Sequence, residues 1–89
     1  MINTLVGLTM AAAAVCGPHE NLLETLDTTY GEQRVFQGLN TEGNLLQLFI
    51  NEEKGSWTVL MVEPGGRACI MSDGQAGEQF DTIPEGEDS

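Results

Sequence analysis

Two cysteines, Cys16 and Cys69, constrain the fold of this chain more than any other feature of its sequence. Cys16 follows a stretch without a charged side chain, and Cys69 lies in the last strand-like run. Closing a loop of about 54 residues with a disulfide stabilises a fold by about 4 kcal/mol in the chain-entropy model. A chain of 89 residues has room for only a small core, so this contribution matters. We predict a disulfide between Cys16 and Cys69; two buried thiols in a cytosolic protein are the alternative.

Residues 1–15 have the composition of an apolar leader. Near their end, Ala12-Ala13-Ala14 fits the small-residue pattern of a signal-peptidase site. The stretch is shorter than the roughly 20 residues that a membrane-spanning helix needs. We therefore predict a signal peptide and no stable membrane span. Bulky Val15 disfavours a lipid anchor on Cys16, and the lack of Lys or Arg in the leader keeps a retained N-terminal arm or strand as the alternative.

The charge of the chain is strongly negative. It has 14 acidic and three basic residues, with a formal net charge of -11. Such a chain repels phosphate backbones and anionic membranes, so we expect it to bind no nucleic acid. Residues 76–89 form an acidic tail, which is either a solvated segment or a docking segment for a basic partner. No calcium-binding loop pattern is present in the sequence.

An amphipathic helix is predicted over residues 18–30. Pro18 suits the first position of a helix, and Leu22, Leu23, Leu26 and Tyr30 recur at spacings that place them on one face. The glycine that follows the pattern favours the left-handed conformation that ends many helices.

Strand patterns follow the helix. Alternating and β-branched runs predict four strands, over residues 33–39, 44–51, 56–63 and 67–72. Turn residues separate consecutive strands, and Pro64-Gly65-Gly66 is the strongest of these signals. We therefore predict an α+β domain over residues 16–75: one N-terminal helix packed on a three- to four-stranded antiparallel meander sheet, after an apolar leader.

The two central strands are apolar on both faces, which is more than one helix covers. Either the tail folds over the second face, or that face pairs with another subunit; an uncovered apolar sheet face marks an interface. Our candidate interaction surface consists of Leu45, Phe49, Trp57, Leu60 and Val62.

Residues that could carry chemistry are few. His19 is the only histidine, and with Cys16 and Cys69 it makes a weak metal-ligand set without a Cys-x-x-Cys pair. A nucleophilic thiolate needs a free cysteine, and both cysteines are expected to be bonded. Trp57 is expected to anchor the core. We predict no catalytic residue, cofactor or metal, and no enzyme activity.

Several short motifs occur in a fixed order along the chain: Cys16-x-x-His19, Tyr30-Gly31-Glu32, Gly38-Leu39, Gly43, Gly55-Ser56-Trp57-Thr58, Pro64-x-Gly66, Cys69 and Gly74. This order over residues 16–75 resembles a family of small exported two-cysteine proteins that occur in alphaproteobacteria and marine phages. The resemblance implies a periplasmic, disulfide-bonded α+β domain and no known activity. The uncharged leader and the longer acidic tail depart from the family pattern.

Together these features predict a non-catalytic exported module, periplasmic or secreted. It would bind a protein partner or self-assemble through an exposed apolar sheet face. Two alternatives stay open. One is a structural protein of a virion, with the leader retained as an arm. The other is an acidic inhibitor of a cationic enzyme or nucleic-acid-binding protein.

Overall fold

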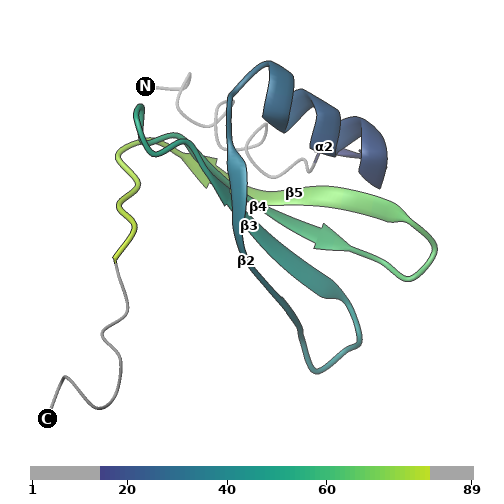
Figure 1. Cartoon of the computed structure of the whole chain (residues 1–89). Coiled ribbons are helices and arrows are strands. Elements are labelled where there is room, and N and C mark those ends of the chain that lie inside the picture. Colours follow the sequence, from purple (N-terminus) through teal and green to yellow (C-terminus); the bar gives the residue numbers. More distant parts are fainter. Residues whose placement is uncertain (1–14, 81–89) are drawn as a thin grey trace, which may run out of the picture.

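The computed structural model describes residues 15–80, which form one helix and one five-stranded sheet (Figure 1). In chain order the elements are β1 (Val15–Pro18), α2 (His19–Thr28), β2 (Gln33–Leu39), β3 (Leu45–Ile50), β4 (Trp57–Val62) and β5 (Arg67–Gly74). The α+β class is confirmed. The predicted leader, apart from its last residue, and most of the acidic tail lie outside the described residues.

The strand order across the sheet is β1-β5-β4-β3-β2, and every neighbouring pair is antiparallel. Strands β2 to β5 form the predicted meander. The fifth strand is β1, so the prediction of three to four strands was wrong. Residues Val15–Pro18 are extended and pair with β5 at the edge of the sheet. The helix consequently begins at His19, with Pro18 as its extended N-cap residue.

Helix α2 lies against one face of the sheet, over β1 and β5 (Figure 1). Its backbone amide at His19 donates a hydrogen bond to the carbonyl of Gly66, in the β4–β5 turn. At its other end, Gly31 N–H donates to Asp27 O and Glu32 N–H donates to Leu26 O. The bond from Gly31 to Asp27 is that of the αL capping motif, and Gly31 adopts the positive φ of 63° that this motif requires.

The core lies between the helix and this inner face of the sheet. Leu26 from α2, Phe49 from β3 and Leu60 from β4 form its buried cluster, and Leu60 is 0% exposed. Leu22, Leu23 and Ile70 pack around these three residues. Truncation of one such buried leucine costs about 2–5 kcal/mol, so this small cluster accounts for much of the stability of the domain.

A polar row crosses the same inner face. Gln47 is 2% exposed. Its Oε1 accepts a hydrogen bond from His19 Nε2 at 2.8 Å, and its Nε2 donates to Gln37 Oε1 at 3.0 Å. The buried amide is therefore paired on both sides, and the contact ties the first turn of the helix to β3.

Candidate protein-binding face

The predicted disulfide between Cys16 and Cys69 is confirmed. The two residues are direct partners in the β1–β5 pair, with Cα atoms 4.0 Å apart, and the bond joins positions separated by 53 residues. Neither cysteine is free for nucleophilic or metal chemistry. The side chain of Cys69 points away from α2, since its neighbours Ala68 and Ile70 belong to the inner rows. The bond therefore lies on the sheet face opposite the helix.

Apolar side chains cover the middle of that opposite face. We use the term outer face for the side chains of Phe36, Leu46, Leu48, Val59 and Met61. Phe36 lies opposite Leu48, Leu48 opposite Val59, and Leu46 opposite Met61, so the set is continuous across β2, β3 and β4. Phe36 is 62% exposed, and the other four residues are half-buried. No described helix or strand packs over this set.

One end of the sheet is closed by the segment after β5. The Trp57 ring lies against Gly74 and Gly77, and its Nε1 donates a hydrogen bond to Gln75 O at 3.1 Å. Gly77 N–H also donates to Gly55 O at 2.8 Å. The packed part of the domain thus continues past the predicted boundary at residue 75, and it leaves the β2 side of the outer face open.

The predicted interaction surface does not form one surface. Leu45, Phe49, Leu60 and Val62 alternate onto the inner face, where Phe49 and Leu60 are buried under the helix. Trp57 lies on the opposite face, one position out of phase with Leu60 and Val62. The prediction is corrected because it combined residues of both faces: Leu45, Phe49, Leu60 and Val62 lie on the helix side, and Trp57 lies on the other side.

The residues considered for chemistry are placed apart from one another. His19 bonds to Gln47 on the inner face, whereas the disulfide lies on the outer side. Within residues 15–80, no three His, Cys, Asp or Glu side chains are grouped as metal ligands would be. The arrangement offers contacts for recognition.

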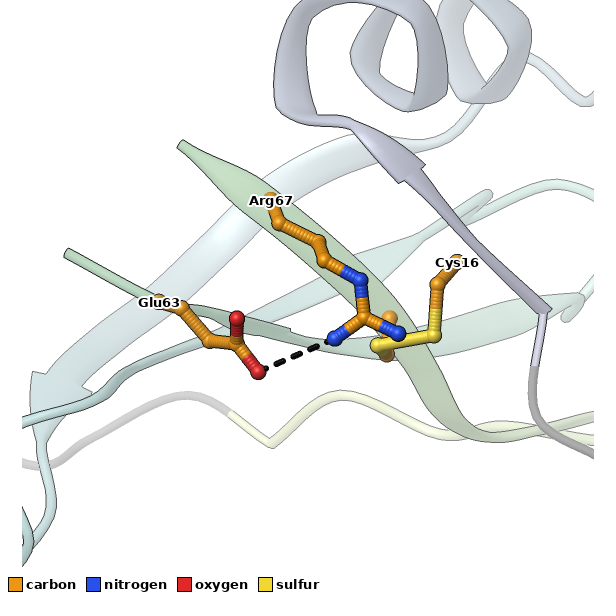
Figure 2. A network of polar contacts seen from close by, with 4 residues as sticks. Cys16, Glu63 and Arg67 are labelled. Carbon is orange, nitrogen blue, oxygen red and sulfur yellow. Dashed lines mark hydrogen bonds and ion pairs between the residues drawn. A yellow bond between two sulfur atoms is a disulfide. The ribbon is translucent and has the colours of Figure 1, made fainter. Parts of the chain in front are cut away.

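A shallow groove of about 510 Å³ runs beside the disulfide, lined by Cys16, Gly17, Pro18, Gly65, Gly66 and Arg67. Figure 2 shows Arg67 in this region, with its Nη1 3.1 Å from Glu63 Oε2. Both side chains of this ion pair are substantially exposed. Arg67 is the charged residue among those that line the groove.

Comparison of the chain with protein-family models, with curated proteins and with solved structures gave no match. Over residues 15–80, no helix is long and apolar enough to cross a bilayer.

Proposed function

We propose that this protein is a non-catalytic exported module that binds a basic protein through its outer face. The observation that carries the proposal is the exposed ring of Phe36 at the end of a continuous apolar row. A large exposed aromatic beside half-buried aliphatic side chains is typical of the centre of a protein interface. The row offers apolar contact for a partner, and its side chains carry no polar group that could act on a substrate.

The charge of the chain favours a basic partner over a second copy. With a net charge of -11, two copies repel each other, while a positively charged protein is attracted over a distance of about a Debye length. An inhibitor of a cationic enzyme fits the same description. It is the more specific form of this proposal, and the form that the charge supports.

Strand β2 adds a second contact for such a partner. It is at the edge of the sheet, and Arg34 is its only charged residue. Natural edge strands usually carry more charge, because an unprotected edge pairs with other strands. A partner strand that added to β2 would lie beside Phe36 and extend the outer face.

The disulfide supports a site of action in an oxidising compartment, since such bonds persist there and are rare in the cytosol. We place the protein in the periplasm or outside the cell. A virion component with a retained N-terminal arm would carry the same bond and the same outer face, and it is the alternative location.

A displayed peptide library tests the binding function. The library is selected against the oxidised protein, and the selected peptides are assayed against Phe36→Ser. We expect peptides rich in Lys or Arg beside apolar residues, and binding at least about tenfold weaker to the variant, which is about 1.4 kcal/mol. Leu39→Ser is the matched control, because Leu39 is an even more exposed apolar residue of β2 that belongs to an inner row.

Light scattering after size exclusion tests the charge argument. We expect a monomer at all concentrations for the wild-type protein. A dimer that forms with concentration and is lost in Phe36→Ser would replace the basic partner with a second copy. If the selected peptides bind Phe36→Ser as tightly as the wild type, the outer face is not the binding surface.

A further inference from the structure

A second site lies on the helix side of the sheet, where α2 ends. A cavity of about 140 Å³ opens there, lined by Leu26, Tyr30, Glu32, Ser56, Trp57, Thr58, Ile70, Asp73, Gly74 and Gln75. Thr58 and Asp73 are direct partners in the β4–β5 pair and form one wall. Leu26 and Ile70 line the cavity from the core side.

Glu32 makes this cavity unusual. The residue is 4% exposed, and its Oε1 is buried without a hydrogen-bond partner in the described part of the chain. The end of α2 fixes its position, because the Glu32 amide donates to Leu26 O. None of the cavity's lining residues is basic. A buried carboxylate oxygen without a donor is costly, so the site calls for a donor from outside.

The size of the cavity limits what that donor is. Small-molecule sites occupy about 300–1,000 Å³, so the cavity is too small for a cofactor. A single water needs only about 10–15 Å³ of such space, so the cavity is larger than one water requires. The head group of one side chain fits between these limits.

The acceptors favour a guanidinium group. Glu32, Asp73 and Thr58 are among the lining residues, and their side chains carry two carboxylates and a hydroxyl. A guanidinium presents five donors in a planar fork that suits carboxylates, and it is more weakly hydrated than an ammonium group. Partial burial therefore costs arginine less than lysine.

We propose that this cavity binds the guanidinium group of an arginine from the partner protein, with Glu32 as the principal acceptor. This inference rests on the proposed function, since it names a chemical feature of the basic partner. It concerns the face opposite to the outer face, so the two sites are tested separately.

Titration of the ¹⁵N-labelled protein with N-acetyl-arginine amide, followed by two-dimensional NMR at constant ionic strength, tests the site. We expect saturable shifts confined to residues 30–32, 56–58 and 73–75, with the indole N–H of Trp57 as an isolated reporter. The citrulline analogue has the same shape without the charge, and it should bind at least tenfold more weakly. The lysine analogue should bind more weakly than arginine. Tighter binding of lysine would overturn the guanidinium assignment.

The variant Glu32→Gln keeps the shape and removes the charge, and it should weaken arginine binding about tenfold. Glu42→Gln is the matched control, since Glu42 is an exposed acid in the β2–β3 turn, outside the cavity. If Glu32→Gln does not fold, Asp73→Asn replaces it, and the citrulline comparison needs no variant.

Three results would overturn the proposal: no saturable shift, equal binding of citrulline, or an equal loss in Glu42→Gln. Phe36→Ser should bind arginine amide as the wild type does. A negative arginine titration therefore does not affect the test of the outer face. A negative peptide-binding result for the outer face likewise does not affect the arginine titration.

Discussion

The ring of Trp57 occupies the space directly above Gly74, its partner across β4 and β5. A Cβ atom at Gly74 would lie 2.9 Å from Trp57 Cζ2, closer than carbon atoms approach in folded proteins. The absence of a side chain at Gly74 is what lets the indole lie flat and bond to the Gln75 carbonyl. Glycine is required at position 74 because the Trp57 ring leaves no room for a Cβ atom.

Gly74→Ala should therefore displace the indole and destabilise the domain by about 1–3 kcal/mol, the usual cost of overpacking. Urea denaturation followed by Trp fluorescence measures the loss. Gly65→Ala is the control, because a Cβ there meets no atom within 4 Å. Equal stability of the two variants would show that the ring moves away without cost.

The buried amide of Gln47 should contribute to stability through its two hydrogen bonds. Gln47→Leu removes the partner of His19 Nε2 and that of Gln37 Oε1. We expect a loss of about 1–2 kcal/mol in the free energy of unfolding, since unpaired polar atoms remain beside an apolar side chain. Gln37→Leu leaves the His19 contact in place and should cost less. A Gln47→Leu protein of wild-type stability would mean that water replaces the amide.

Reduction of the disulfide should lower the free energy of unfolding by about 2–4 kcal/mol, because the open chain regains its conformational freedom. Urea denaturation with and without a reductant measures the difference. The double variant Cys16→Ala, Cys69→Ala should match the reduced protein and show no response to the reductant. A double variant as stable as the oxidised wild type would contradict the chain-entropy argument.

The ion pair between Arg67 and Glu63 should contribute little. Its side chains are 57% and 37% exposed, and exposed pairs are worth about 0–1 kcal/mol. A double-mutant cycle with Arg67→Met and Glu63→Gln should give a coupling below about 0.5 kcal/mol that falls further in high salt. A coupling above about 1 kcal/mol would point to a structural role beside the disulfide groove.

Sequence patterns predicted the helix and the meander well. The helix was expected over residues 18–30 and is found over His19–Thr28; the second strand was expected over 44–51 and is found over Leu45–Ile50. The alternation of apolar and polar residues and the presence of turn residues determine local conformation, so they can be recognised in the sequence. Strand β1 was missed, because four residues containing Gly17 and Pro18 have no strand pattern. Its conformation depends on pairing with β5, which is a tertiary contact.

The choice of buried face could not be made from alternation. In β3, the row with Leu45, Gln47 and Phe49 contains a polar residue, whereas the row with Leu46, Leu48 and Ile50 is wholly apolar. The helix nevertheless covers the row with Gln47, because His19 and Gln37 satisfy the amide there. A hydrogen-bond partner 28 positions away is invisible to periodicity. Burial of Glu32 was unpredictable because it depends on tertiary packing around the end of α2.

The two cysteines of the disulfide are synthesised at different times. Cys16 leaves the ribosome long before Cys69, and the whole meander lies between them. The bond consequently cannot close until the last strand is available, so an oxidising enzyme would act on a nearly completed sheet. Oxidation of this domain would thus record that its final strand has reached its place.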